Sequence, residues 1–412
     1  MLAVLTLILA LSILAQTNDW VSLIKDNSLE GWKPLGGEWT IEDGAIKGTL
    51  KKKESEFDKA VSIWLMYEKK EFADFELELE FRTLRPINGG VQFRTHWLPI
   101  LPVPENAKPE DMVYDCYGYQ ANIETRVKKA TGGIMEENGR GYLAEPSDES
   151  VKTLTQKGWN RMKIEAIGPK IKVYLHDVLS AEIEDDKFIK GYILLQVRAD
   201  EVIKDEPVSV EYRNIRIKDL GRIGNWVSLF NGTNLDGWKN YGSEEWTVEN
   251  GVIVGKSGPK KSEGYLATEN TWKDFRARAK FKMLGEGNYG FFYHSSIKMR
   301  EDGYPIISGV QVEVEPGYPT KTGWLYESYK RGWLVEPNTQ TPASWALRPN
   351  DWNEIEVKCI GNKTTTWLNG IKVVEFDDPS PNLFEGFFAL QLHTGGTAGI
   401  MWKDIFVLEE LK

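Results

Sequence analysis

The sequence predicts an all-β protein built from two tandem domains, each a two-sheet sandwich or jelly roll. The first observation is an internal repeat, because residues 19–33, DWVSLIKDNSLEGWK, recur as residues 225–239, NWVSLFNGTNLDGWK. The second is a series of short runs in which β-branched and aromatic residues alternate with polar ones, as in FELELEF at 75–81 and EIEVKCI at 354–360. Such alternation is typical of strands with one buried face. The repeat divides the 412 residues into two domains, and each is long enough to bury a core of its own.

The N-terminal segment has a different character from the rest of the chain. Residues 2–14 form a mainly apolar run that is too short to cross a bilayer as a helix. Such a run fits the apolar core of a secretory signal, with cleavage after Ala15. We therefore expect residues 1–15 to be a signal peptide and the protein to be exported, periplasmic or extracellular, with no stable membrane insertion once the signal is removed. The alternative is an N-terminal anchor that stays attached.

The two repeats are expected at residues 18–220 and 224–412, joined by a short linker. Asp43-Gly44, Asn250-Gly251 and Asn369-Gly370 mark hairpins, since such pairs suit type I′ turns. Repeat 1 carries extra residues between Arg94 and Gln120, and these are rich in proline (LPILPVPENAKP, residues 98–109). Proline cannot donate to a strand ladder, so we expect an ordered surface loop there.

Composition excludes several classes of function. The net charge of −10 argues against a nucleic-acid partner, because phosphate binding needs a basic surface. Glycine-rich phosphate loops, GxSxG and HExxH are absent, so no nucleotide cofactor is expected. Cys116 and Cys359 stand at positions of the two repeats that do not correspond, which favours two separate buried thiols.

Alternation within the strands predicts which side chains of repeat 2 leave the core. Apolar residues at 310, 312 and 314, and at 388, 390 and 392, face inward, so the residues between them face outward. If the strands are neighbours, five polar side chains converge on one sheet face: His294, Gln311, Glu313, Gln391 and His393. Two imidazoles beside a carboxylate could ligate a divalent metal or transfer a proton near neutral pH. The alternative is a solvated sandwich surface.

Repeat 1 keeps the same phase but replaces the titratable groups. Its corresponding outward residues are Arg94, Gln120, Asn122, Gln196 and Arg198. They can form hydrogen bonds with a ligand, but they include no base. We therefore expect repeat 2 to perform any chemistry, while repeat 1 binds substrate or is a degenerate copy.

A loop in repeat 2 adds further candidates for substrate binding. Arg331 and Trp333 follow Tyr326, and repeat 1 has Arg140 and Tyr142 at the matching places. Aromatic rings that stack on a sugar, beside a guanidinium that bonds its hydroxyls, suit a carbohydrate ligand. The alternative is a turn anchored by a core aromatic residue.

These stretches together resemble a known family. The segments FNGTNLDGWK, EWTVENGVIVG, WKDFRARAKF, DWNEIEVKCIGNKTTTWLNGIKVVEF, FFALQLH and KDIFVLEEL, in this order, resemble the 3-keto-disaccharide hydrolase or 3-keto-glycoside 1,2-lyase-hydratase domain. Repeat 2 resembles it along nearly its whole length, and repeat 1 more loosely, with Arg198 where the histidine of LQLH stands. The resemblance implies a concanavalin A-like jelly roll whose concave sheet binds sugar.

The resemblance also implies an activity, which is cleavage of glycosides already oxidised to a ketone at C3. The ketone acidifies the C2 proton, so a base can remove it while the C1 aglycone leaves, and water then adds to the enone. From alternation and chemistry we assign Glu313 or His393 as base or metal ligand and His294 as ligand or acid, with a divalent metal as a possible cofactor. Gln311 and Gln391 would hold sugar hydroxyls. The competing hypothesis is a tandem lectin-like protein that binds glycans without catalysis.

Overall fold

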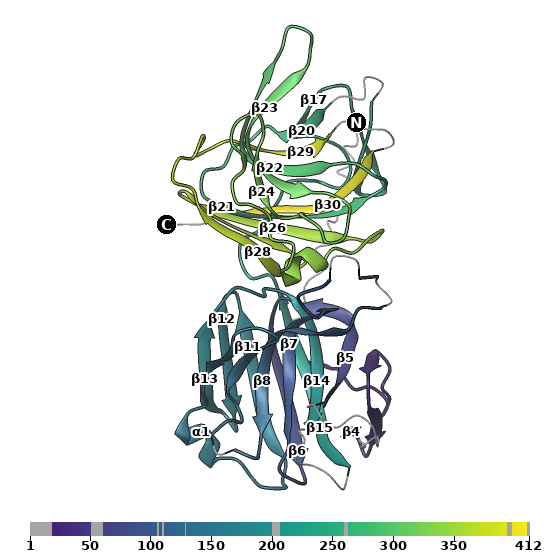
Figure 1. The fold of residues 1–412 in the computed structure, drawn as a ribbon, viewed down its shortest axis with the longest axis vertical. Coiled ribbons are helices and arrows are strands. Elements are labelled where there is room, and N and C mark those ends of the chain that lie inside the picture. The colour runs from purple at the N-terminus through teal and green to yellow at the C-terminus, as the bar shows by residue number, and fades with distance from the viewer. Residues whose placement is uncertain are drawn as a thin grey trace, which may run out of the picture.

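The computed structural model describes residues 19–50, 61–104, 107–108, 111–127, 129–199, 207–258, 263–393 and 398–409. The chain forms two β-sandwiches stacked end to end along the long axis (Figure 1). The expected signal peptide, residues 1–15, lies outside the described residues. Within the described ranges, no helix is long and apolar enough to cross a membrane.

Within its described residues, domain 1 comprises one short α-helix and fifteen strands paired into two sheets. An eight-stranded sheet has the order β13-β12-β11-β6-β15-β4-β3, with β1 on β15, and a seven-stranded sheet has the order β10-β9-β8-β7-β14-β5-β2. The elements are β1 (Val21–Ser22), β2 (Trp32–Leu35), β3 (Glu38–Glu42), β4 (Ala45–Leu50), β5 (Val61–Phe72), β6 (Asp74–Thr83), β7 (Asn88–Pro99), β8 (Tyr114–Glu124), β9 (Ile134–Glu137), β10 (Gly141–Ala144), α1 (Asp148–Lys152), β11 (Asn160–Ile167), β12 (Lys170–Leu175), β13 (Val178–Glu184), β14 (Gly191–Ala199) and β15 (Val208–Gly221).

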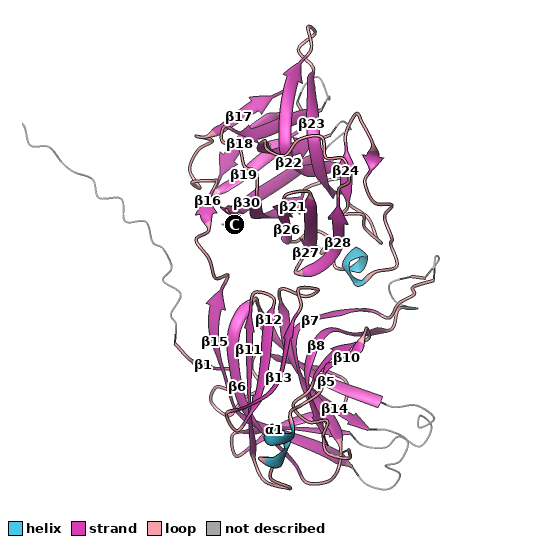
Figure 2. Ribbon diagram, turned by 90° about the vertical axis from the view of Figure 1, so that its left-hand side faces the viewer, coloured by secondary structure: helices cyan, strands magenta, loops and turns pink. Residues whose placement is uncertain are grey.

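Domain 2 repeats this topology strand for strand. Its eight-stranded sheet has the order β18-β19-β30-β21-β26-β27-β28, with β16 on β30, and its seven-stranded sheet has the order β17-β20-β29-β22-β23-β24-β25. The elements are β16 (Val227–Ser228), β17 (Trp238–Tyr241), β18 (Glu245–Glu249), β19 (Val252–Lys256), β20 (Gly264–Thr268), β21 (Phe275–Met283), β22 (Tyr289–Met299), β23 (Pro305–Val314), β24 (Leu325–Glu327), β25 (Gly332–Trp333), the 3-10 helix η2 (Pro342–Trp345), β26 (Asn353–Ile360), β27 (Lys363–Leu368), β28 (Ile371–Asp377), β29 (Phe387–Leu392) and β30 (Gly399–Leu408). The predicted pair of all-β, concanavalin A-like sandwiches is confirmed (Figure 2).

The predicted hairpin turns are present. Asn250 and Gly251, between β18 and β19, have φ of 51° and 78°, and Asn369 and Gly370, between β27 and β28, have φ of 50° and 91°. A type I′ turn requires positive φ at both central residues. The proline-rich segment of domain 1 differs slightly from prediction, because β7 continues to Pro99 before the loop begins.

Apolar contacts join the two domains end to end. Ala343, Ala346 and Ile371 of domain 2 belong to the apolar cluster that forms the core of domain 1. The backbone also pairs across the boundary, where Ile189 N donates to Gly370 O at 2.8 Å and Lys372 N donates to Lys187 O at 2.8 Å. The domains are therefore packed against each other and are not merely linked.

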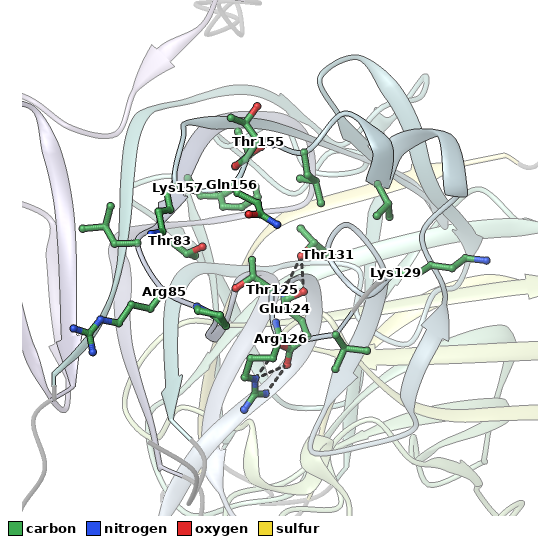
Figure 3. Close-up of a pocket in the computed structure, with 17 residues that line it drawn as sticks. Thr83, Arg85, Glu124, Thr125, Arg126, Lys129, Thr131, Thr155, Gln156 and Lys157 are labelled. Atoms are coloured by element: carbon green, nitrogen blue, oxygen red, sulfur yellow. Dashed lines mark hydrogen bonds and ion pairs between the residues drawn. The ribbon is translucent and has the colours of Figure 1, made fainter. Parts of the chain in front are cut away.

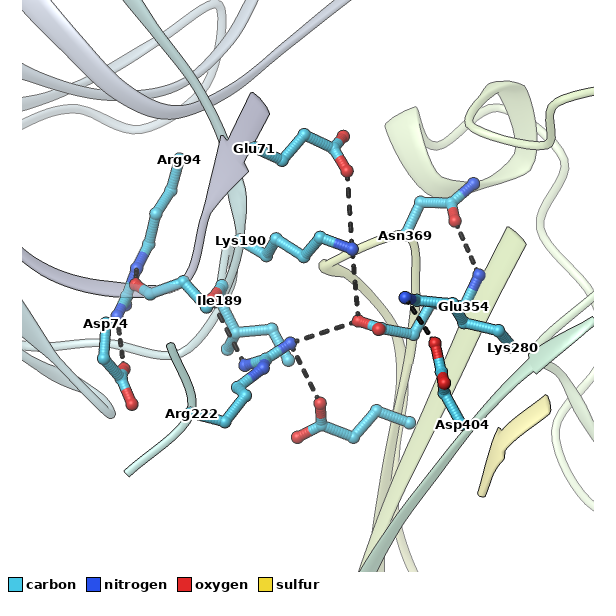
Figure 4. A network of polar contacts seen from close by, with 12 residues as sticks. Glu71, Asp74, Arg94, Ile189, Lys190, Arg222, Lys280, Glu354, Asn369 and Asp404 are labelled. Atoms are coloured by element: carbon cyan, nitrogen blue, oxygen red, sulfur yellow. Dashed lines mark hydrogen bonds and ion pairs between the residues drawn. The ribbon is translucent and has the colours of Figure 1, made fainter. Parts of the chain in front are cut away.

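A network of buried charges lies beside these contacts (Figure 4). Nζ of Lys190, in domain 1, lies 3.4 Å from Oε2 of Glu71 and 3.4 Å from Oε1 of Glu354. A guanidinium nitrogen of Arg222, in the linker, lies 3.0 Å from Oε2 of Glu356. Burial alone would raise the pKa of Glu354, but the positive charges around it, those of Lys190 and Arg222 foremost, lower that pKa to about 2. The network therefore holds Glu354 ionised at the domain boundary.

Candidate functional site

A cleft of about 560 Å³ lies on the face of the domain 2 seven-stranded sheet that points away from the core. Strands β20, β29, β22, β23 and β24 are consecutive neighbours in this sheet, so outward side chains from distant parts of the sequence meet there. The residues that line the cleft are Glu263, Asn288, Gln311, Glu313, Glu315, Tyr326, Ser328, Tyr329, Trp333, Gln391 and His393. We call this the domain 2 cleft.

Glu313 is a buried carboxyl group in the wall of the cleft. Its side chain is held by two amides, since Gln311 Nε2 donates to Oε2 at 2.9 Å and Asn288 Nδ2 donates to Oε1. Burial raises the pKa of Glu313 to about 8, so the group carries its proton at neutral pH. Gly290 on the adjacent strand makes room for this arrangement, because a Cβ there would lie 2.8 Å from Gln311 Cγ.

His393 stands at the end of β29 in the same cleft and is held by a second carboxylate. Its Nε2 lies 2.7 Å from Oε1 of Glu263, and the other oxygen of Glu263 accepts hydrogen bonds from Tyr265 at 2.8 Å and Tyr329 at 2.6 Å. Burial opposes ionisation of Glu263, but the hydrogen bonds from His393, Tyr329 and Tyr265 outweigh it and lower its pKa. An ionised Glu263 that accepts from Nε2–H leaves the imidazole lone pair on Nδ1.

The remaining wall combines aromatic rings with an amide. Tyr326 and Trp333 pack edge to face with ring centroids 5.2 Å apart, and Tyr329 is 58% exposed beside them. Gln391 is buried on the floor, and its Oε1 has no hydrogen-bond partner among the described residues. A buried acceptor without a partner is costly unless a ligand or water bonds to it.

A family model now decides the identity of both domains. The model of the 3-keto-alpha-glucoside-1,2-lyase-like domain matches residues 19–218 and again residues 225–408. The chain belongs to this family. The predicted membership and the predicted tandem duplication are both confirmed.

Solved structures resemble the chain over about one domain. A putative glycosyl hydrolase from Parabacteroides distasonis ATCC 8503 is 21% identical and covers 45% of this chain and 94% of its own, with a TM-score of 0.34. The carbohydrate-binding module CBM66 from Bacillus subtilis is 20% identical and covers 46% of this chain and 96% of its own, with a TM-score of 0.32. No curated protein matches the chain.

The prediction that His294 joins the cleft of the second lyase-like domain is wrong. A bulge interrupts the pairing of β22 and β23 between Tyr293 and Ser296, and His294 has a φ of 46° within it. The bulge shifts the alternation of side chains by one residue, so the imidazole of His294 is buried. The centroid of its ring lies 5.6 Å from that of Phe275, and its Nε2 bonds to Lys273 O at 2.6 Å. Burial lowers the pKa of His294. The residue is structural.

The expected metal ligands and the expected role of Arg331 in substrate binding also differ from the structure. The predicted metal set of His294, Glu313 and His393 does not form, and within the described ranges no group of three or more His, Cys, Asp or Glu could hold a metal ion. Arg331 does not line the cleft, because it is ion-paired with Glu327 and, at 2.7 Å, with Asp378. It ties the β24–β25 hairpin to the loop after β28.

The first lyase-like domain has a row of neutral amides and a tyrosine on part of the corresponding face. Its side chains form a chain of hydrogen bonds, from Gln92 to Gln120 at 2.7 Å, from Gln120 to Asn122 at 3.1 Å and from Asn122 to Tyr142 at 2.7 Å. Arg198 takes the position of His393, opposite Ser62 on β5, and its guanidinium lies 3.6 Å from Glu137.

Arg94 was expected to bind substrate on this face, and the structure contradicts that expectation. It lies in a bulge with φ of 48°, as His294 does, and its guanidinium is fully buried. It donates to Ala73 O at 2.9 Å and to Gly168 O at 2.8 Å, and it is ion-paired with Asp74 at 3.2 Å. The bulge turns this side chain toward the end of the sandwich.

Sequence reasoning missed Glu263, Asn288 and Tyr329 in the cleft. Glu263 stands directly before β20 and two residues before Tyr265, so alternation places the two on one face. That signal was present in the sequence. Asn288 and Tyr329 lie just outside strands, where alternation gives no information.

Proposed function

We propose that the domain 2 cleft cleaves 3-keto-glycosides by elimination at C1 and C2 followed by addition of water. The observation that carries the proposal is that Glu313, whose pKa burial raises to about 8, lies in the same cleft as His393, whose imidazole is held by Glu263 at 2.7 Å. A buried carboxyl group whose pKa is raised, beside an imidazole that is oriented by a carboxylate, supplies the acid and the base that a proton-transfer reaction requires. Membership of a lyase-like family supports the same reaction.

The base in this proposal is His393. The C3 ketone acidifies the C2 proton of the sugar, and Nδ1 of His393 accepts that proton while its Nε2–H stays bonded to Glu263. Negative charge then develops on the C3 oxygen, and the hydroxyl of Tyr326 in the cleft wall donates to it. Glu263 stabilises the imidazolium that forms.

The acid is Glu313. Its proton passes to the glycosidic oxygen as the C1–O bond breaks, which leaves a double bond between C1 and C2 conjugated with the ketone. In the second half of the reaction, the Glu313 carboxylate takes a proton from water as the oxygen adds to C1, and His393 returns its proton to C2. The net result is hydrolysis. Because Glu313 must be protonated at the start, we expect turnover to fall above about pH 8.

Substrate is held by groups that take no part in proton transfer. The unpartnered Oε1 of Gln391 accepts from a sugar hydroxyl, and the exposed aromatic rings at the rim stack on the pyranose. The same rim favours a second candidate function, glycan binding without catalysis. In that case Tyr326 and Trp333 would carry the affinity, and the acid and base would be dispensable.

The test measures release of 4-nitrophenol from 4-nitrophenyl 3-keto-glucoside and from the unoxidised glucoside, after chelation of metals and again with added Mg²⁺, Mn²⁺ or Ca²⁺. We expect release from the keto substrate alone. Glu313→Gln and His393→Gln should each lower kcat by roughly 10²–10⁴-fold.

Matched controls are Glu137→Gln, a half-buried carboxyl group of domain 1, and His176→Gln in a domain 1 turn. Both should leave kcat unchanged. Absence of release under every metal condition, together with saturable binding of unoxidised glycans, would replace the catalytic proposal with the lectin-like one. Release that survives both cleft variants would show that the reaction occurs elsewhere.

A further inference from the structure

A cavity at the far end of domain 1 shows how a loop of this fold can hold its polar side chains by local contacts. The cavity encloses about 370 Å³ between the ends of β6 and β8 and the segment that runs from α1 to β11 (Figure 3). Arg126 Nε donates to Glu124 Oε1 at 2.9 Å, and Thr131 Oγ1 donates to the backbone oxygen of Glu124 at 2.8 Å. These contacts join residues of one loop, and they stabilise that loop.

The turn between β24 and β25 in domain 2 contains a tyrosine whose contacts are not local. The hydroxyl of Tyr329 donates to Glu263 Oε2 at 2.6 Å, and the hydroxyl of Tyr304, at the tip of the β22–β23 hairpin, lies 3.4 Å from it. Strands β29, β22 and β23 lie between β24 and β20, and Glu263 immediately precedes β20. Tyr329 therefore extends over the domain 2 cleft to reach its partner.

The backbone of Tyr329 is strained. Its φ is 58°, which lies in the left-handed region that bulky side chains rarely occupy. Burial of the ring does little to offset this strain, because the residue is 58% exposed. Strained residues that persist in a folded protein cluster at functional sites. The conformation of Tyr329 therefore indicates a functional constraint.

The equivalent turn of domain 1 shows that the fold does not require a tyrosine at this position. Arg331 of domain 2 and Arg140 of domain 1 each bond to the glutamate four residues before them, so the two turns are equivalent. Counting from these arginines, Asn138 corresponds to Tyr329. Asn138 has a φ of 50°, which asparagine tolerates, and its Nδ2 donates to Cys116 O at 2.9 Å.

The partner of Tyr329 also differs between the domains. Glu263 is replaced by Ser62 in domain 1, as the pairing of β20 with β29 and of β5 with β14 shows. Domain 1 likewise has Arg198 in place of His393. The strained tyrosine thus occurs in the domain that has the glutamate and the histidine, and an unstrained asparagine replaces it in the domain that has neither.

From these observations we infer that Tyr329 is a positioning residue for the reaction proposed above, on which this inference rests. Its hydroxyl and that of Tyr265 both hold Oε2 of Glu263, so Oε1 stays 2.7 Å from His393 Nε2. Because Tyr329 reaches Glu263 from across the sheet, the position of the β24–β25 turn determines how the imidazole is oriented. Tyr329 itself transfers no proton.

Kinetics of two variants test the inference. Tyr329→Phe keeps the ring and removes the hydroxyl. We expect kcat for release of 4-nitrophenol from 4-nitrophenyl 3-keto-glucoside to fall by about 10–10²-fold, with KM changed by less than about twofold, because Glu263 can then rotate and His393 is misaligned. Tyr329→Asn installs the domain 1 residue, which suits this backbone, and it should lower kcat to a similar extent.

The matched control is Tyr318→Phe, which makes the same change at another half-exposed tyrosine of domain 2. The hydroxyl of Tyr318 bonds to the carbonyl oxygens of Trp345 at 2.8 Å and Leu347 at 2.6 Å, outside the cleft. This variant should leave kcat unchanged. A rise in KM at constant kcat in Tyr329→Phe would assign Tyr329 to substrate binding and overturn the positioning role.

Crystal structures of wild type and Tyr329→Phe test the inference independently of turnover. We expect the distance between Glu263 Oε1 and His393 Nε2 to exceed about 3.2 Å in the variant, beyond the range of a hydrogen bond. An unchanged contact in the variant, or an unchanged kcat in an active enzyme, would overturn the inference. If the wild type releases no 4-nitrophenol, the proposed reaction is wrong, and the two structures still decide whether Tyr329 positions the imidazole.

Discussion

The outward faces of the two seven-stranded sheets share one backbone and differ in their chemistry. In domain 1, Gln120 and Asn122 bond to each other and to neighbouring neutral groups. Oε1 of Gln196 is buried without a partner among the described residues, as Oε1 of its counterpart Gln391 is. In domain 2, the position of Asn122 is a carboxyl group, Glu313, and that of Arg198 is an imidazole, His393. A few side chains thus separate a row of hydrogen-bonded amides from a cleft that contains a carboxyl group and an imidazole.

Converting domain 2 toward domain 1 should have the largest effect. Glu313→Asn and His393→Arg install the residues that domain 1 has, and each should lower kcat for aglycone release by roughly 10²–10⁴-fold, because a positioned acid or base is lost. The double variant should lose little more than either single variant, since the two groups act as a unit. His176→Arg, in the β12–β13 turn of domain 1, is the control. Full loss from that control would mean that domain 1 takes part in the reaction.

The pH dependence of stability should differ between the two faces. Glu313 has a pKa of about 8 in the folded protein against an ordinary value of 4.5, whereas Asn122 does not titrate. Between these values the unfolded chain releases its proton and the folded chain keeps it, so stability is lost as the pH rises from about 4.5 to 8. The loss is at most roughly 5 kcal/mol. Urea unfolding at pH 5 and pH 8.5 should show this loss in wild type and not in Glu313→Gln. A difference between the two proteins that stays constant with pH would contradict the assignment.

The two bulge residues should contribute unequally to stability. Arg94→Ala leaves the buried Asp74 without its cation and should cost about 3–5 kcal/mol. His294→Ala removes a neutral hydrogen bond and some packing, and should cost about 1–3 kcal/mol. Unfolding free energies from urea titration of both variants check the order. Equal losses would mean that the ion pair adds nothing beyond packing.

Two equivalent glycines provide the smallest and most local comparison. A Cβ at Gly290 would lie 2.8 Å from Gln311 Cγ, and one at Gly90 would lie 2.5 Å from Gln120 Cδ. Both alanine variants should lose about 1–3 kcal/mol of stability. Only Gly290→Ala should also lower kcat, by up to about 10²-fold, because Gln311 holds Glu313. A matching loss in Gly90→Ala would again implicate domain 1.

The fold followed from the sequence because its signals are local and repeated. The signals are the alternation of apolar and polar residues, the Asn-Gly and Asp-Gly turns, and the duplicated segment. Each of them is found in the strands and hairpins of the observed sheets. Alternation also placed Gln311, Glu313, Gln391 and His393 correctly on one face. It failed at His294 and Arg94, since a bulge shifts the phase by one residue and leaves no mark in an otherwise regular strand.

Contacts across the sheet were beyond the reach of the sequence. Tyr329 reaches Glu263 at 2.6 Å although 65 residues separate them in the chain and β29, β22, β23 and β24 come between β20 and the turn that carries Tyr329. Glu263, the partner of His393, could therefore be inferred from the phase of β20. Asn288 and Tyr329 lie outside strands, so their place in the cleft required the three-dimensional structure.

The packing at the domain boundary has a consequence for the redundancy that duplication normally provides. A spare copy of a domain can be discarded if it stands alone, but Ile371 of the second copy completes the core of the first, and Lys190 of the first neutralises Glu354 of the second. Deleting either half would leave apolar surface in water and buried charges without partners. The two copies therefore depend on each other for their stability, although only the second has the Glu313 and His393 pair.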